Sequence, residues 1–315
     1  MSAIEIKGVT KKFGKFTAVN NLSLSIPENK IFGLLGSNGA GKTTTINMLT
    51  GLLLPDEGSI KILGMDALKD IEKIRQNISL VPQTISLYEN LTIYENMEFF
   101  GGLYISNNQD LKQRIEDLLN IFHLLEKRNT KIMNLSGGYQ RRCSIACSVL
   151  SNPKILFLDE PSTGIDIYTN KIIMDFIKSL ENTTVIFTTH SIKEAEAICD
   201  YLVFLDRGEK VLEGSPKQIV KEYSKKIGEK IIIEFDISVD IEKVKDYLEK
   251  SDFNIRNLSS VGKSISFETL DIGNSVIDVM DSLKTLKSHF LNVDIIKPKL
   301  EDIFNLIMEE RNENR

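Results

Sequence analysis

One glycine-rich segment limits the folds open to this chain more than any other feature. Residues 36–43 read GSNGAGKT and match the phosphate-binding pattern G-x-x-x-x-G-K-[ST] at every fixed position. The apolar run at 31–35 (IFGLL) indicates a buried strand before this loop, and residues 43–50 (TTTINMLT) indicate a helix after it. Strand, loop and helix in this order predict an α/β domain built around a phosphate site.

The chemistry of that loop predicts binding of a nucleoside triphosphate. Its backbone N–H groups and the positive end of the helix dipole attract anions, and its glycines let the chain approach phosphates closely. Lys42 can reach the β- and γ-phosphates, and the Thr43 hydroxyl can ligate Mg²⁺. A glycine-rich turn that carried a lysine by chance would lack the flanking strand and helix.

The composition limits the partners and the compartment. The 315 residues carry a net charge of −5, so no overall positive charge favours a nucleic-acid partner. The N-terminal segment MSAIEIKGVT lacks the layout of a signal peptide, and no apolar run approaches the roughly 18–20 residues needed to span a bilayer. We therefore expect a cytoplasmic protein that can still dock on a membrane partner. The three cysteines fit a reducing compartment, and Cys143 and Cys147 fit buried thiols better than a metal pair because no second ligand pair lies nearby.

Hydrophobic patterning divides the chain into two domains. Short alternating strands surround the phosphate loop at 4–7, 22–26 and 59–63. Continuous apolar strands, typical of a parallel sheet covered on both faces, lie at 78–81, 155–158, 185–187 and 202–205. Helical periodicity is clear at 111–125, 140–150, 169–180 and 192–199. We therefore expect residues 1–224 to form one domain, 225–229 a polar linker and 230–315 a second domain.

The second domain has its own order of elements. Strands are expected at 230–235, 253–256, 264–268 and 293–296. Helices are expected at 241–248, 276–286 and 299–308. Before the final helix the order is β-α-β-β-α-β, which predicts a small α+β, ferredoxin-like fold.

An acidic motif supplies a second part of the predicted site. Residues 155–160 (ILFLDE) form an apolar strand that ends in two acids. Asp159 can hold Mg²⁺ through its water shell, and the Glu160 carboxylate, beside the γ-phosphate, can polarise the attacking water. One acid after a strand is commonly a solvated turn, but two acids downstream of a phosphate loop favour catalysis.

A third motif, residues 135–142 (LSGGYQRR), lies at the start of a predicted helix. Its serine hydroxyl and two glycines form another anion site. The segment resembles the LSGGQ signature of ATP-binding-cassette (ABC) proteins, with tyrosine in the fifth position. The resemblance covers about residues 3–223 with every motif in order. It implies a P-loop NTPase cassette with a parallel-sheet core, an antiparallel β subdomain and a helical subdomain.

The resemblance also implies roles for single residues. Phe13 stands where the family has an aromatic side chain, usually tyrosine, that stacks on adenine. Gln83 matches the glutamine that contacts Mg²⁺ or water and links the nucleotide to the partner subunit. Asp166 matches the acid of the segment called the D-loop, and His190 matches the switch histidine that contacts the γ-phosphate.

ATP and Mg²⁺ are the expected cofactors, and the expected site has three groups of residues. The catalytic group is Glu160, His190 and Gln83. The Mg²⁺ group is Thr43, Gln83 and Asp159. The nucleotide group is Phe13, Gly36, Ser37, Asn38, Gly39, Ala40, Gly41, Lys42, Thr43, Thr44, Ser136, Gly137, Gly138 and Asp166.

Cassettes of this family act in pairs, in which each ATP lies between the phosphate loop of one cassette and the signature of the other. This chain carries one of each, so the resemblance implies that it needs a second cassette. Both motifs are intact, which fits a homodimer with two working sites. Pairing with a cassette from another gene stays open.

Two segments resemble exporters of the ABC-2 type. Residues 41–66 resemble the phosphate-loop helix and following turn of that subgroup, and the C-terminal segment with PKLEDIF resembles the accessory domain of drug- and polysaccharide-exporting cassettes. Residues 91–104 (LTIYENMEFFGGLY) occupy the place that receives helices of the membrane subunits, although core packing explains their aromatic stripe equally well. The expected function is ATP hydrolysis that powers export through a separate integral-membrane permease, on the cytoplasmic face of the membrane.

Two other functions stay open. An importer cassette would share every catalytic motif, although its regulatory domain is usually a small β-barrel. A non-transport ABC ATPase, acting as a binding or mechanical device, would carry two cassettes or a long coiled-coil insertion, and neither is present. The C-terminal domain could equally serve only to stabilise the dimer, and the sequence does not name the cargo.

Overall fold

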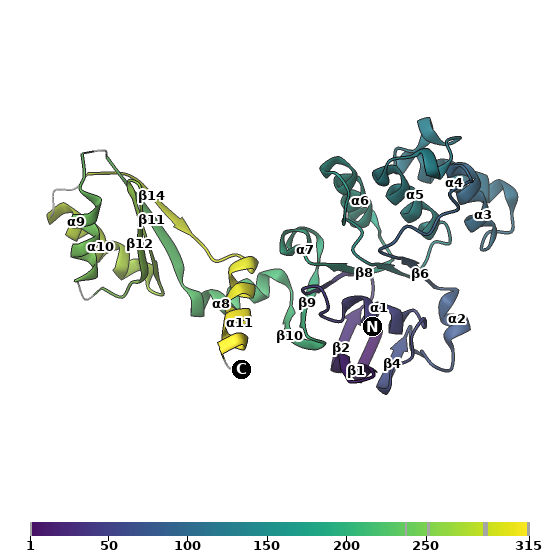
Figure 1. Cartoon of the computed structure of the whole chain (residues 1–315), viewed down its shortest axis with the longest axis horizontal. Helices are drawn as coiled ribbons and strands as arrows, with labels where there is room; N and C mark the ends of the chain where they lie inside the picture. Colours follow the sequence, from purple (N-terminus) through teal and green to yellow (C-terminus); the bar gives the residue numbers. More distant parts are fainter. Residues whose placement is uncertain (1, 237, 251–252, 286–288, 314–315) are drawn as a thin grey trace. The chain divides into compact units, whose positions relative to one another are not determined.

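A computed structural model describes residues 2–236, 238–250, 253–285 and 289–313 (Figure 1). It divides into two compact units, Met1–Ser215 and Pro216–Arg315. The boundary lies earlier than the expected one at 224, because helix α8 (Pro216–Ile227) belongs to the second unit, where it packs against α11 (Leu300–Glu313). The expected linker at 225–229 is therefore the end of α8, Gly228 and the first residue of a strand. Within these described ranges, no helix combines the length and the apolarity that a membrane span requires.

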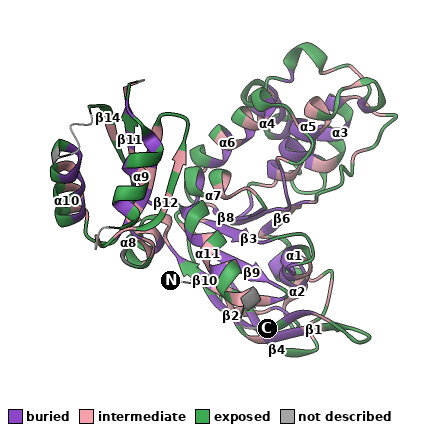
Figure 2. Ribbon diagram, turned by 60° about the vertical axis from the view of Figure 1, so that its left-hand side comes forward, coloured by how far each residue is buried: buried purple, intermediate pink, exposed green. Residues whose placement is uncertain are grey.

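A six-stranded sheet forms the centre of the first unit, in the order β10-β9-β3-β8-β7-β6. Its strands are β3 (Ile31–Leu35), β6 (Ile78–Val81), β7 (Ile155–Leu158), β8 (Thr184–Thr189), β9 (Tyr201–Asp206) and β10 (Glu209–Gly214). All except β10 run parallel to their neighbours. Figure 2 shows the central strands as buried, which explains why their sequences are continuously apolar.

Strand β10 is one of the elements that hydrophobic patterning did not predict, with β5 (Met65–Asp66) and α2 (Ile71–Arg75). It lies at the sheet edge with only part of its length buried, so its apolar signal is weak. Arg207 and Gly208 join it to β9 and have φ angles of 51° and 81°. Two successive residues with positive φ are typical of a tight hairpin turn.

A second, antiparallel sheet packs beside the phosphate loop in the order β2-β1-β4-β5. Its strands are β1 (Ser2–Phe13), β2 (Phe16–Pro27), β4 (Glu57–Ile62) and β5 (Met65–Asp66). The strands expected at 4–7 and 22–26 lie in the first half of β1 and the second half of β2, which are each 12 residues long. One continuous core joins this sheet to β3, so the two sheets hold the phosphate loop between them.

The helices of the first unit begin where the sequence places N-terminal signals. They are α1 (Lys42–Leu49), α2 (Ile71–Arg75), α3 (Ile93–Gly102), α4 (Asn108–Ile121), α5 (Gly137–Val149), α6 (Ile167–Ser179) and α7 (Ile192–Ile198). Helices α3, α4 and α5 contact one another and form the expected helical subdomain (Figure 1). Helix α4 ends before the predicted position 125, because His123 has a left-handed φ of 53° that breaks the helical path.

The second unit has the expected order of elements. They are β11 (Glu229–Phe235), α9 (Ile241–Glu249), β12 (Arg256–Val261), β13 (Ser264–Thr269), α10 (Ile272–Thr285), β14 (Phe290–Ile296) and α11. The four strands form an antiparallel sheet in the order β12-β13-β11-β14, which is a split βαβ arrangement. The strand expected at 253–256 is wrong, because Phe253 and Ile255 pack against the core from a loop and β12 starts only at Arg256. Leu286, the expected end of the helix at 276–286, lies outside the described residues.

Candidate active site

The loop between β3 and α1 lines a cavity of about 340 Å³. Residues 38–44 form one wall, and Phe16, Ala18, Gln83 and Glu160 complete the lining. Gly41 begins α1 with a φ of 98°, and a Cβ atom at this position would lie 2.5 Å from the carbonyl oxygen of Ala18. Only glycine fits there. Among the described residues no side chain caps α1, so its first N–H groups remain available for phosphate oxygens.

Lys42 is the buried first residue of α1, and its ammonium group has three partners. It donates to the carbonyl oxygens of Gly36 at 2.9 Å and Ser37 at 3.1 Å, and lies 3.2 Å from Oε1 of Glu160. Burial raises the pKa of Glu160, but the hydrogen bond and charge of Lys42, with help from Thr163 and His190, outweigh burial and lower that pKa overall. Glu160 is therefore ionised at neutral pH, and a γ-phosphate would compete with it for Lys42.

Glu160 gathers the other predicted catalytic residues. Its Oε2 accepts hydrogen bonds from Thr163 Oγ1 at 3.1 Å and Gln83 Nε2 at 3.4 Å, and lies 3.6 Å from Nδ1 of His190. Its backbone has a left-handed φ of 45°, which costs about 1–3 kcal/mol for a residue other than glycine. The Glu160 N–H donates to Thr188 Oγ1 at 2.8 Å and so holds this conformation.

The oxygen atoms expected to bind Mg²⁺ suit that ion. Thr43 and Gln83 line the cavity with a hydroxyl and an amide, and Asp159 is a buried carboxylate whose Oδ1 accepts a hydrogen bond from Thr188 Oγ1 at 2.6 Å. Asp159 does not itself line the cavity, which fits contact through a water shell. Within the described part of the chain, no cluster of three or more His, Cys, Asp or Glu side chains could hold a metal ion. An Mg²⁺ ion at this site would therefore share its coordination with phosphates.

The signature residues form a second group, separate from the phosphate loop. Ser136 and Gly137 are exposed at the start of α5, and the Ser136 hydroxyl makes no capping bond to the described part of α5. A Cβ atom on Gly138 would lie 2.7 Å from Thr169 Oγ1, so α6 approaches this glycine closely. Asp166 caps α6, and its carboxylate accepts hydrogen bonds from Thr169 N at 2.9 Å and Thr169 Oγ1 at 2.8 Å. Among the described residues, the hydrogen bonds and ion pairs of this group do not reach the phosphate loop of the same chain.

Arg141 joins the signature helix α5 to the two loops that carry Gln83 and Glu160. It was not identified from the sequence as a site residue. Its side chain is 2% exposed, and all five of its N–H donors have backbone carbonyl partners. These carbonyls belong to Pro82, Gln83, Asp159, Glu160 and Pro161. Burial lowers the pKa of Arg141 to about 10 although the Asp159 charge opposes that shift, so the guanidinium stays charged at neutral pH.

Glu194 of α7 joins two further loops, and it too was missed. Its carboxylate accepts hydrogen bonds from Ser162 Oγ at 2.8 Å, Thr189 Oγ1 at 2.9 Å and Asn170 Nδ2 at 3.1 Å. Ser162 is the first residue of the predicted D-loop, residues 162–166 (STGID), and Thr189 precedes His190. The carboxylate therefore fixes the histidine segment relative to the D-loop.

Phe16 lines the cavity, whereas Phe13 does not. The two residues face each other across the β1–β2 hairpin, and both side chains are exposed. The two-residue turn between them was the signal in the sequence that could have identified Phe16. Stacking of adenine on Phe13 remains a prediction.

Comparison with known proteins shows the family of this chain. A family model described as ABC transporter matches residues 19–163. The linearmycin resistance ATP-binding protein LnrL of Bacillus subtilis (strain 168) is 36% identical over 237 residues, which cover 75% of each chain. The Nod factor export ATP-binding protein I of Rhizobium sp. (strain N33) is 38% identical over 223 residues, which cover 70% of this chain and 73% of that protein.

Solved structures share the fold of the first unit. A dimeric, post-hydrolysis state of the ATP-binding cassette MJ0796 bound to ADP and Pi aligns with a TM-score of 0.63 and 30% identity, over 67% of this chain and 98% of that one. An ATP-binding subunit of an ABC transporter aligns with a TM-score of 0.64 and 25% identity, over 71% of this chain and 94% of that one. The chain belongs to the ATP-binding-cassette family of ABC transporters, whose cassettes hydrolyse ATP.

Proposed function

We propose that this chain is the ATP-hydrolysing subunit of an exporter and that it powers a separate ABC-2 type membrane permease. The observation that carries the hydrolytic part is the ionised Glu160, held beside the phosphate loop by Lys42, Thr163 and Gln83. The names of its relatives, Nod factor export and linearmycin resistance, support export.

The residues divide the chemistry of hydrolysis among themselves. Phosphate oxygens bind to the N–H groups of α1 and draw Lys42 away from Glu160. Freed from that charge, the Glu160 carboxylate becomes a stronger base and accepts a proton from the attacking water, which Gln83 and His190 orient. Mg²⁺, held by Thr43, Gln83 and Asp159 when bound, supplies positive charge to the phosphate oxygens.

A second cassette completes the site. The exposed Ser136 and Gly137 offer a hydroxyl and helix N–H groups to an anion, and their own phosphate loop does not use them. We infer that ATP lies between the phosphate loop of one cassette and the signature of a second, head-to-tail copy. The dimeric state of the MJ0796 cassette, bound to ADP and Pi, supports this arrangement.

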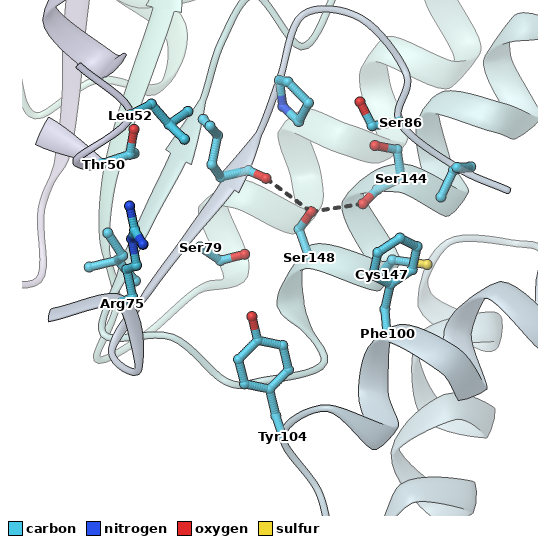
Figure 3. A pocket seen from close by; sticks show the side chains of 14 residues that line it. Thr50, Leu52, Arg75, Ser79, Ser86, Phe100, Tyr104, Ser144, Cys147 and Ser148 are labelled. Atoms are coloured by element: carbon cyan, nitrogen blue, oxygen red, sulfur yellow. Dashed lines mark hydrogen bonds between the residues drawn. The ribbon is translucent and has the colours of Figure 1, made fainter. Parts of the chain in front are cut away.

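A groove next to the Gln83 segment suits the permease. It has a volume of about 400 Å³ and is lined by β6, α3 and α5; Figure 3 shows Ser148 on its floor, bonded to the carbonyl oxygens of Leu80 and Ser144. In α3, Met97 is buried, whereas Phe99 is exposed, as are Leu103 and Tyr104 just beyond its end. One face of residues 91–104 therefore packs in the core, and we propose that the exposed face receives a helix of the permease.

Co-purification of the membrane partner tests the proposal. The full chain, expressed with the permease from the neighbouring gene, is expected to retain a six-helix ABC-2 permease. Leu103→Glu combined with Tyr104→Glu should abolish this retention while the ATPase activity of the isolated chain persists. Val261→Glu, at an exposed residue of the other unit, is the matched control. Retention of an importer permease with a substrate-binding protein would overturn export.

A further inference from the structure

We propose that strand β14 is a docking surface for a second copy of this chain, so that two C-terminal units join edge to edge into one continuous antiparallel sheet. The proposal concerns the second unit, for which the catalytic cycle gives no role. It rests on the proposed function only in that a homodimer brings a second copy of the unit near.

The exposed edge of β14 carries the first part of the argument. Strand β14 is the last in its sheet and pairs on one side only, with β11, among the described residues. Proteins usually protect such edges with lysine, proline or short strands. The seven residues of β14 (FLNVDII) include neither lysine nor proline, and four large apolar side chains are exposed: Phe290 by 44%, Leu291 by 65%, Ile295 by 48% and Ile296 by 40%.

The opposite edge of the same sheet is built differently. Strand β12 (RNLSSV) carries an arginine, an asparagine and two serines, and Val261 at its end is its one large apolar side chain that is strongly exposed, at 80%. The contrast indicates that β14, and not β12, is the edge that a partner covers.

The sequence of β14 is complementary to itself, which selects a second copy as the partner. An antiparallel pair centred on Val293 places each Asn292 opposite Asp294, an amide donor opposite a carboxylate acceptor. The same register places Leu291 opposite Ile295 and Phe290 opposite Ile296, so apolar side chains meet apolar ones. A two-fold axis through Val293 therefore gives an isologous interface with no mismatched pair.

Cysteine cross-linking tests the register in the full-length chain. In the proposed pair the two Val293 Cα atoms lie about 4.5–5.5 Å apart, within the disulfide range of about 4.4–6.8 Å. The two Ile295 Cα atoms lie about 13 Å apart, from a rise of about 3.3 Å per residue. Val293→Cys should therefore form a disulfide-linked dimer under mild oxidation, and Ile295→Cys should not. The natural cysteines are buried, so the unaltered chain is the background control.

Further variants separate local effects from the interface. Val293 is partly buried and Leu291 forms a bulge against β11, so Asn292→Cys with Asp294→Cys provides a second, exposed cross-link. Ile295→Lys in the Val293→Cys background should abolish the dimer, whereas Val261→Lys on the other edge should leave it intact. The proposal is overturned if neither cross-link forms.

The closed cassette dimer distinguishes this proposal from the proposed function. Glu160→Gln with ATP should form a dimer through the cassettes, whatever the second units do. If that dimer forms but neither cross-link forms within it, the edge pairing is wrong and the catalytic proposal stands. If Val293→Cys cross-links but Glu160→Gln does not dimerise with ATP, the edge pairing stands and the proposed closed cassette dimer is wrong.

Discussion

The phosphate loop and the signature are both anion sites at helix N-termini, yet they differ in how complete they are. The phosphate loop is surrounded by three buried charged residues, Lys42, Asp159 and Glu160. Lys42 lies 3.2 Å from Glu160, and Thr188 forms hydrogen bonds with both acids. At the signature, Ser136 and Gly137 are exposed, and the hydroxyl makes no capping bond to the described part of α5. The phosphate loop is therefore preorganised by its own chain, whereas the signature leaves its donors exposed, as the proposed pairing with a second cassette requires. Four experiments test this contrast: the Glu160→Gln variant, dimers that mix two defective variants, the Arg141→Met variant, and unfolding at low pH.

The largest effect is expected for Glu160→Gln. Loss of the general base should lower turnover by about 10²–10⁴-fold, while ATP still binds because the cradle of N–H groups is unchanged. Steady-state hydrolysis and equilibrium nucleotide binding measure the two effects separately. Hydrolysis at the parental rate would show that Glu160 is not the base.

Mixed dimers test whether the two halves come from different chains. Lys42→Ala damages the phosphate half and Ser136→Arg damages the signature half, so each variant alone should lack turnover. A mixed dimer of the two has one site with both lesions and one intact site, so mixing should restore part of the activity. Lack of any recovery, with dimers present by sedimentation, would contradict a site shared between chains.

Arg141→Met is expected to lower both the stability of the cassette and its turnover, because Arg141 holds the backbone of Gln83 and Glu160 in place. It removes a donor from five carbonyl groups. The carbonyls of Asp159 and Pro161 are buried, and each buried group left unsatisfied costs about 1–3 kcal/mol of unfolding free energy, whereas the Glu160 carbonyl still accepts from Thr163 N. Misplacement of Gln83 and Glu160 should lower kcat by up to about 10²-fold, with a much smaller change in the KM for ATP. Denaturant unfolding and steady-state kinetics provide the measurements.

Arg141→Lys serves as the conservative control, because its ammonium retains three of the five donors. It should recover part of both losses. Equal losses in kcat and in ATP affinity would instead indicate general unfolding of the cassette.

The smallest effect concerns pH. The pKa of Glu160 lies below its ordinary value of about 4.5 in the folded chain, so the pairing with Lys42 stabilises folding above that value and loses its effect as the pH falls through the folded pKa. The difference in unfolding free energy between the parental chain and Glu160→Gln should thus be constant near neutral pH and shrink in acid. A difference that grows in acid would contradict the pairing.

Residues that act through local spacing could be predicted from the sequence. The phosphate loop, the two acids after β7 and the histidine after β8 each follow a strand, and a strand end fixes where the next side chain points. The structure places Lys42, Gln83, Glu160 and His190 together as the motif order implies. Their individual roles in catalysis stay predictions.

Residues that act by joining distant segments could not be predicted. The partners of Arg141 lie 18 to 59 positions away, and Thr188 reaches both Asp159 and Glu160 from another strand. Neither contact leaves a periodic signal in the sequence. The expected domain boundary at 224 is later than the observed one for a related reason, since α8 joins the second unit by packing against α11, a segment distant from it in the sequence.

Arg141 also links the segments that carry Gln83, Glu160 and the signature. Two loops, at 82–83 and 159–161, meet the start of helix α5 at one planar cation, which uses every donor it has. If one of these segments moves alone, hydrogen bonds between Arg141 and the backbone carbonyls must break. If the bonds are kept, the other two segments must move as well. The three segments are therefore tied together through one side chain, so the signature helix and the loops that carry Gln83 and Glu160 share the contacts that hold them in place.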